Sequence, residues 1–117
     1  MREGLVGIEI EGRGDVVLAR LTGELDVAGA NRTGERIAEA VPTSATGLVV
    51  DLTDLEFIDS SGVSMLFGLA RRLGSRRQQI RVAAPPRGPV SRVLEIVDFE
   101  RAAPVRPDVE TAVADLG

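Results

Sequence analysis

The sequence contains no cysteine, histidine, lysine, tyrosine or tryptophan, and these absences exclude several kinds of chemistry. Without cysteine there is no disulfide and no thiolate metal site. Without histidine or lysine, a serine nucleophile lacks its usual bases, imidazole metal sites are impossible, and no phosphate-binding loop ending in Lys-Ser or Lys-Thr exists. Only carboxylates remain as acids or bases, so we expect a protein that is not an enzyme and needs no cofactor.

Charge and aromatic content argue against a nucleic-acid partner. The net charge is −4, whereas a nucleic-acid partner calls for a basic face. Phenylalanine is the only aromatic residue, with three copies, so platforms for base stacking are scarce. No apolar run approaches the roughly 20 residues that span a bilayer, and residues 1–4 do not resemble a signal peptide. We therefore expect no nucleic acid, no membrane segment and a cytoplasmic location.

The remaining composition is that of an ordinary soluble protein. Apolar residues make up 44% of the 117 positions and charged residues 27%, which is typical of a globular chain. This length suits one compact domain, so we expect a single domain over residues 1–117, with a core of Val, Leu, Ile and Ala.

Two short strands are predicted at the start of the chain. Residues 7–11 alternate between apolar and polar side chains, and residues 16–21 form a second apolar run. The turn signal Arg-Gly-Asp at 13–15 lies between them, which favours a hairpin. Residues 22–26 indicate a polar corner.

The next segment has a weaker helical pattern. Asp26 is a good N-cap for a helix over residues 27–41, while Gly29 and Gly34 lower its helical propensity. Capping would be a sufficient structural role for Asp26.

The middle of the chain carries the strongest signals. The β-branched run at 48–52 is typical of a central strand covered on both faces. Phe57 and Ile58 continue toward the core, and residues 59–62 open a helix that ends at Gly74. The apolar positions of this helix, spaced by three and four, are Val63, Leu66, Phe67, Ala70 and Leu73.

The last third alternates strands and helices again. Residues 79–83 predict a strand, residues 90–98 a short helix, and residues 103–105 an edge strand that tolerates proline. Asp108 is placed to cap a last helix over 109–116. The whole order predicts an α/β fold: a mixed, mostly parallel β-sheet of about five strands with about four helices packed against it.

The segment Asp-Ser-Ser-Gly at 59–62 carries the most functional information. It follows a buried strand and opens a helix, where functional groups of open α/β sheets tend to lie. Asp59 or Ser60 can supply the one N-cap that the helix needs, which leaves Ser61 as a spare hydroxyl beside the small Gly62. The alternative is that the motif only caps the helix.

Two charged clusters have simpler interpretations. Three acids could suggest a Mg²⁺ site with an aspartyl-phosphate, but that chemistry needs a nearby lysine, so we interpret them as turn and cap residues; they are Asp51, Asp54 and Asp59. Four arginines near the end of the long helix could bind an anion, but a solvated helix end is the simpler interpretation; they are Arg71, Arg72, Arg76 and Arg77.

The sequence resembles the STAS domain family, in particular bacterial anti-sigma factor antagonists. The resemblance extends from about Val6 to Leu116. It rests on residues 21–26, 48–52 and 57–63, with weaker matches at 93–96, 104–105 and 109–116.

The resemblance implies the STAS fold and a regulatory function. Such antagonists bind an anti-sigma factor that is also a Ser/Thr kinase and thereby free a sigma factor. The kinase phosphorylates the serine immediately before the motif glycine, here Ser61, and the complex separates until a phosphatase resets it. An aspartate of the family on a loop beside that serine matches Asp26.

We therefore expect Ser61 to be the phosphorylated residue and its neighbours to bind the partner. The expected partner-binding residues are Glu24, Asp26, Asp59, Ser60, Gly62 and Ser64. A phosphate adds about −1.5 to −2 charges, which a helix N-terminus tolerates but a partner fitted to this acidic surface would not. Two alternatives stay open: a constitutive STAS subunit of a lipid-transport ABC transporter and, less favoured, an enzyme that uses carboxylates alone.

Overall fold

The first two strands form the predicted hairpin. In the computed structural model, which describes residues 5–116, β1 (Val6–Arg13) pairs antiparallel with β2 (Val16–Leu25). Gly14, with φ of 62°, supplies the left-handed conformation of the turn. The segment 22–25 is not a polar corner: it stays extended because β2 pairs there with β1 on one side and β4 on the other.

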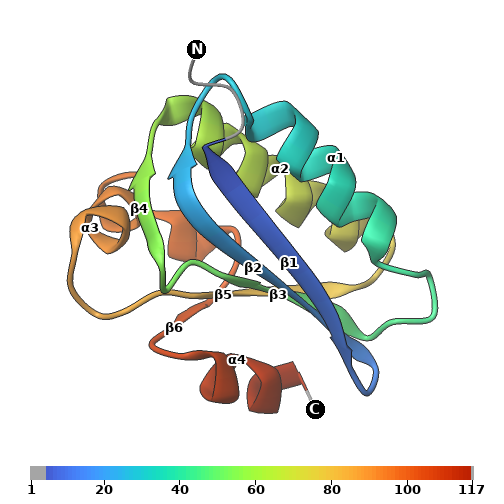
Figure 1. The fold of residues 1–117 in the computed structure, drawn as a ribbon. Helices are drawn as coiled ribbons and strands as arrows, with labels where there is room; N and C mark the ends of the chain where they lie inside the picture. The colour runs from blue at the N-terminus through green and yellow to red at the C-terminus, as the bar shows by residue number, and fades with distance from the viewer. Residues whose placement is uncertain (1–4, 117) are drawn as a thin grey trace.

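Among residues 5–116 the strands form one mixed sheet of six, against the approximate five expected; five of them follow the order β1-β2-β3-β5-β6 (Figure 1). β3 (Gly47–Asp51) and β5 (Gln79–Ala83) lie at its centre, and β6 (Val105–Arg106) lies at one edge. β4 (Leu55–Ile58) pairs with the C-terminal end of β2. Every pairing except β1–β2 is parallel, so the predicted mixed, mostly parallel α/β sheet is confirmed.

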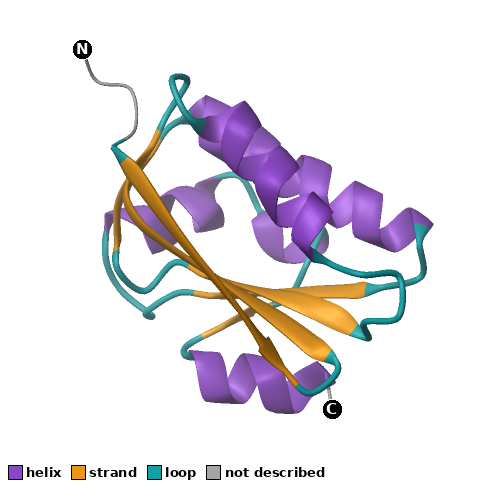
Figure 2. Ribbon diagram, turned by 45° about the vertical axis from the view of Figure 1, so that its right-hand side comes forward, coloured by secondary structure: helices purple, strands orange, loops and turns teal. Residues whose placement is uncertain are grey.

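Helices cover both faces of the sheet (Figure 2). α1 (Ala30–Ala40) and α2 (Ser60–Ser75) pack side by side on one face and enclose the larger core. α4 (Val109–Leu116) covers part of the other face, and α3 (Pro89–Ile96) packs against β4 before a short 3₁₀ turn. Within the described residues, no helix combines the length and the apolar character needed to cross a membrane.

Two predictions from the sequence concern the ends of the chain. Residues 1–4, interpreted above as unlike a signal peptide, lie outside the described residues, as does residue 117. The predicted cap of the last helix is confirmed: the Asp108 carboxylate accepts a hydrogen bond of 2.7 Å from the N–H of Thr111, and this bond holds the pKa of Asp108 below its ordinary value.

The prediction that Asp26 caps the first helix is wrong. α1 begins at Ala30, its N-cap position is Gly29, and no side chain caps it. The Asp26 carboxylate instead accepts a hydrogen bond of 3.0 Å from the N–H of Ala28, and its carbonyl accepts bonds from Gly29 and Ala30. Because the side chain and the carbonyl of Asp26 both accept bonds from residues two to four positions later, residues 26–29 form a separate turn before the helix starts.

Two glycines allow α2 to approach its neighbours closely. A Cβ at Gly34 would lie 2.7 Å from Cγ of Met65, so this glycine, which weakened the helical pattern, brings α1 against α2. A Cβ at Gly62 would lie 2.8 Å from the carbonyl oxygen of Leu25 and 2.6 Å from Cγ1 of Ile58. The first turn of α2 is therefore held directly against the end of β2.

This contact predicts opposite effects of one substitution at two places in α2. Gly62→Ala should lower the free energy of unfolding by about 1–3 kcal/mol, because the carbonyl of Leu25 cannot move aside easily. Gly68→Ala is the matched control, since its Cβ would meet nothing nearer than an Arg71 side-chain nitrogen at 3.9 Å. It should raise the free energy of unfolding by about 0.5–1 kcal/mol. Urea unfolding measures both, and equal effects would contradict the close approach at Gly62.

A cluster of charges around Asp115 of α4 predicts a pH dependence of the stability. The Asp115 carboxylate lies 2.7 Å from Nε of Arg81 and 3.0 Å from Nη2 of Arg106. The hydrogen bond from Arg81, aided by the charge of Arg106, holds the pKa of Asp115 below its ordinary value. Because the pKa of Asp115 is lowered in the folded protein, its ion pairs contribute their full stabilisation above the unfolded-state pKa, which is about 4. This stabilisation is lost as the pH falls further.

Asp115→Asn should therefore be less stable than the wild type at pH 7, and the difference should shrink as the pH falls below about 4. Urea unfolding at pH 7 and pH 3 measures it. Glu39→Gln, an exposed carboxylate of α1 without an ion pair among residues 5–116, is the control and should show no such change. A difference for Asp115→Asn that is equally large at both pH values would contradict the ion-pair explanation.

Candidate functional site

The first turn of α2 is capped by Asp59. Oδ1 of Asp59 accepts hydrogen bonds from the N–H groups of Ser61, at 2.8 Å, and Gly62, at 3.1 Å. Of the two predicted caps, Asp59 takes this role, and Ser60 becomes the first residue of the helix. The cap satisfies two of the N–H groups that a helix N-terminus leaves without a partner.

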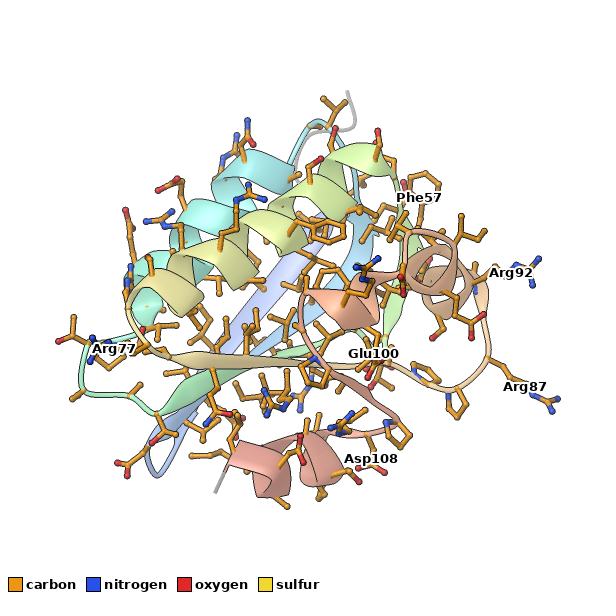
Figure 3. The ribbon with its side chains drawn as sticks, turned by 180° about the vertical axis from the view of Figure 1, so that it is seen from behind. Phe57, Arg77, Arg87, Arg92, Glu100 and Asp108 are labelled. Carbon is orange, nitrogen blue, oxygen red and sulfur yellow. The ribbon has the colours of Figure 1, made fainter. Side chains whose placement is uncertain are left out.

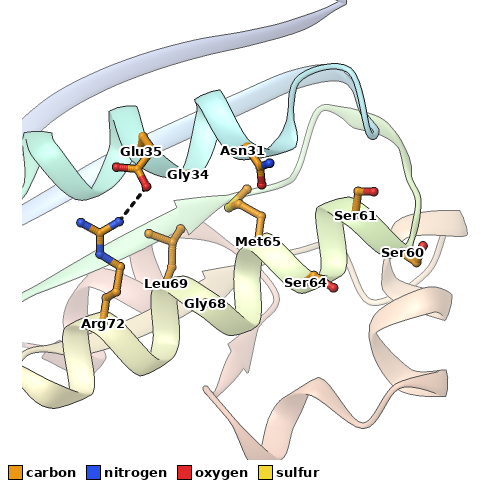
Figure 4. Close-up of a pocket in the computed structure, with 10 residues that line it drawn as sticks. All are labelled: Asn31, Gly34, Glu35, Ser60, Ser61, Ser64, Met65, Gly68, Leu69 and Arg72. Carbon is orange, nitrogen blue, oxygen red and sulfur yellow. Dashed lines mark hydrogen bonds and ion pairs between the residues drawn. The ribbon is translucent and has the colours of Figure 1, made fainter.

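The hydroxyl of Ser61 is not needed by the fold. Ser61 is half-buried, its N–H is bound by Asp59, and its Oγ makes no hydrogen bond among residues 5–116. Figure 4 shows the side chain projecting from the first turn of α2. The structure thus leaves this oxygen accessible, neither sealed in the core nor used by the backbone.

Ser61 lines a groove of about 420 Å³ between α1 and α2 (Figure 4). At one end the groove carries three hydroxyls from the start of α2, and toward the other end Glu35 and Arg72 form an ion pair at 3.3 Å. The residues that line it are Asn31, Gly34, Glu35, Ser60, Ser61, Ser64, Met65, Gly68, Leu69 and Arg72. The groove therefore places Ser60 and Ser64, both exposed, on the same surface as Ser61.

The end of β2 lies beside the first turn of α2. The N–H of Asp59 donates a hydrogen bond of 3.2 Å to the carbonyl of Leu25. Asp26 follows Leu25 in the chain, so the turn at 26–29 lies next to the cap. Glu24 is half-buried and faces Phe57 across the β2–β4 pairing. The structure thus brings two of the expected acidic residues to the helix that carries Ser61.

Gly62, expected among the partner-binding residues, is buried within the chain. It is buried, with Ile58 and the Leu25 carbonyl within contact distance of the position that a Cβ would take. Its small size serves the packing of α2 against β2 rather than access to Ser61. Gly62 therefore positions the first turn of α2, and its expected contact with a partner stays a prediction.

The three acids considered for a metal site lie in separate environments. Asp51 is 3% exposed and pairs with Nε of Arg20 at 3.1 Å, a bond that raises the pKa of Arg20. It also accepts hydrogen bonds from the N–H and hydroxyl of Thr53. Asp54 is exposed in the turn before β4, and Asp59 is the cap. Among residues 5–116, no acidic residues are grouped so that they could hold a metal ion.

Three features of this region were not predicted from the sequence. Arg72 was interpreted as part of a solvated helix end, and it is exposed, but it also pairs with Glu35 at the rim of the groove. Asn31 and Glu35, four positions apart, lie on one face of α1, a periodicity that the sequence displays. Phe57 was expected to continue toward the core but is 47% exposed, in a short strand whose buried residues are Leu55 and Ile58 at its two ends.

The cap predicts how substitutions at Asp59 should behave. Asp59→Ala should lower the free energy of unfolding by about 1 kcal/mol, because two N–H groups lose their acceptor. Asp59→Asn should stay close to the wild type, since its side-chain oxygen still accepts both bonds. Urea unfolding compares them, and an alanine variant as stable as the asparagine variant would show that the cap contributes nothing.

Comparison with known proteins gives consistent results. The family model of the STAS domain matches residues 7–112. The anti-sigma-F factor antagonist RsfB of Mycobacterium tuberculosis is 29% identical over 87 residues, which are 74% of this chain and 69% of RsfB. The anti-sigma F factor antagonist of Paenibacillus polymyxa is 26% identical over 110 residues, 93% of each chain.

Solved structures share the fold. An anti-sigma factor antagonist from Mycobacterium paratuberculosis superposes with a TM-score of 0.84 at 24% identity, over 95% of this chain and 93% of that chain. The phosphorylated form of the Bacillus cell fate determinant SpoIIAA gives a TM-score of 0.68 at 24% identity, over 95% of this chain and all of that chain (100%). Because the family model spans most of the sequence and the architecture agrees, this chain belongs to the STAS domain family.

Proposed function

We propose that this chain is an anti-sigma factor antagonist that binds an anti-sigma factor and is released when Ser61 is phosphorylated. Its relatives in Mycobacterium tuberculosis and Paenibacillus polymyxa are antagonists by name. The observation that carries the proposal is the Ser61 hydroxyl: accessible, at the second residue of α2, and free of any hydrogen bond among residues 5–116. A cytoplasmic location suits a protein that acts on transcription factors.

The proposed partner is an anti-sigma factor that is also a Ser/Thr kinase, and a separate phosphatase would reset the switch. In the transfer, Oγ of Ser61 attacks the γ-phosphorus of ATP, the bond to the β-phosphate oxygen breaks, and a base of the kinase takes the hydroxyl proton. Ser60 and Ser64 share the surface, but only Ser61 directly precedes the motif glycine. That position selects Ser61 from the three.

Charge explains why the complex would separate. Phosphorylated Ser61 carries about −1.5 to −2 charges, and a partner fitted to the acidic surface around Asp26 and Asp59 would be repelled by this extra charge. At about 6 Å and an effective dielectric constant near 20, each like-charge pair costs about 3 kcal/mol. That energy corresponds to roughly a hundredfold loss of affinity. One hydroxyl is therefore sufficient for a switch.

The chain itself adds to the effect of the phosphate. Asp59 already accepts bonds from the N–H groups of Ser61 and Gly62, so a phosphate on Ser61 shares the positive end of the helix with a carboxylate. The turn that carries Asp26 lies against the same end. We expect rearrangement at this end on phosphorylation while the core keeps its packing, and the solved SpoIIAA structure is of a phosphorylated protein with this fold.

The test uses purified anti-sigma factor kinases encoded in the source genome. Wild type should bind one of them and, with ATP, gain a single phosphate that mass spectrometry places on Ser61. Ser61→Ala should bind but stay unmodified, and Ser61→Asp should bind roughly a hundredfold more weakly. Ser60→Ala and Ser64→Ala are matched controls that should still be phosphorylated and released.

Two results would contradict the proposal. One is a phosphate on another residue while Ser61 stays unmodified. The other is a Ser61→Asp variant that binds the kinase as tightly as the wild type does.

A further inference from the structure

Three large apolar side chains gather on the surface where α3 packs against β4. Phe57 is 47% exposed, Ile96 70% and Val97 37%. Figure 3 shows Phe57 beside α3, and Val93, one turn before Ile96, continues the surface into the core. We call the surface formed by Phe57, Val93, Ile96 and Val97 the β4–α3 patch.

The fold does not require an aromatic side chain at position 57. The two other phenylalanines of the chain, Phe67 and Phe99, meet edge to face in the core with ring centroids 5.0 Å apart. The buried contacts of β4 come from Leu55 and Ile58 at its two ends. Single exposed apolar residues are common, but a cluster on adjoining elements is typical of an interaction site.

The charges around the β4–α3 patch restrict what can cover it. Four carboxylates flank it on both elements, against three nearby arginines, Arg87, Arg92 and Arg101, the first two of which lie around Glu95. Arg101 also lies 3.8 Å from one of these acids, Asp98. The flanking carboxylates are Asp54, Glu56, Glu95 and Asp98.

The excess of acids on this rim disfavours two common occupants. A second copy placed face to face would set like charges against each other, and an anionic lipid surface would repel the rim. The rim fits a protein segment with apolar side chains at its centre and Arg or Lys at its edges. The occupant is therefore a different protein with a basic edge.

The position of the patch relates it to the proposed partner. β4 runs through Asp59 directly into the first turn of α2, so the patch adjoins the helix that carries Ser61. It is formed by β4 and α3, whereas the groove that contains Ser61 is lined by α1 and α2. We infer that the β4–α3 patch is a second docking surface for the anti-sigma factor and binds a basic-edged apolar segment of it; this inference rests on the proposed function.

A docking surface away from the hydroxyl has a distinctive consequence. Phe57, Ile96 and Val97 are not part of the first turn of α2, so their contacts contribute in both phosphorylation states. Loss of the patch should weaken binding and raise KM for phosphorylation, while kcat and the ratio of affinities between the two states stay unchanged.

The test compares Phe57→Ser and Ile96→Ser with Ile10→Ser, which removes an exposed apolar side chain from β1. Against the purified anti-sigma factor that binds the wild type, the first two should bind at least about tenfold more weakly, and the control should bind normally. Because the three side chains are only partly exposed, at 36% for Ile10, 47% for Phe57 and 70% for Ile96, thermal unfolding checks that each variant remains folded at the temperature of the binding assay. KM, kcat and affinity for the phosphorylated form complete the comparison.

A second pair of variants tests the charge of the rim. Glu95→Lys should slow association several-fold at low salt, because it repels a basic partner edge, whereas Glu39→Lys on α1 should not. If Phe57→Ser and Ile96→Ser bind like Ile10→Ser, the patch is not a docking surface, and the role of Ser61 is unaffected. If no anti-sigma factor binds the wild type, the proposed function and this inference fall together.

Discussion

The contact between the first turn of α2 and the end of β2 determines the geometry of the site. Gly62 allows the helix to approach the carbonyl of Leu25, and Asp59 donates its own N–H to that carbonyl while its side chain caps the helix. A larger residue at 62 or a weaker cap at 59 would move the turn that presents Ser61. The close packing of α2 against β2 thus also determines where the Ser61 hydroxyl lies on the surface.

The residues of the motif Asp-Ser-Ser-Gly therefore have different roles. Asp59 caps the helix backbone, and Gly62 allows close packing against β2. Among the described residues, neither serine side chain makes a hydrogen bond that the fold needs. Ser61 combines this freedom with a place in the groove between α1 and α2, beside the turn that carries Asp26. A modification there would change a surface while the sheet stays intact, which is what a reversible switch between a bound and a released state of a small protein requires.

Elements with strong local patterns were predictable from the sequence. The buried run of β3, the periodicity of α2 and the Asp59 cap all follow from short-range rules, and the structure has them. Tertiary contacts decided the rest. Residues 22–25 stay extended because two strands pair with them, α1 starts late because Asp26 closes its own turn, and Gly34 is explained only by Met65 on another helix. The exposure of Phe57 was equally unpredictable, since it depends on β4 lying at the margin of the sheet.

The central claim is that one phosphate at the start of α2 alters binding without altering the fold. The most direct measurement is the affinity of one anti-sigma factor for the chain before and after stoichiometric phosphorylation, with backbone amide NMR spectra of both forms. The account predicts roughly a hundredfold loss of affinity, with spectral changes confined to the first turn of α2 and the turn at 26–29. Equal affinities, or spectral changes throughout the sheet, would contradict it.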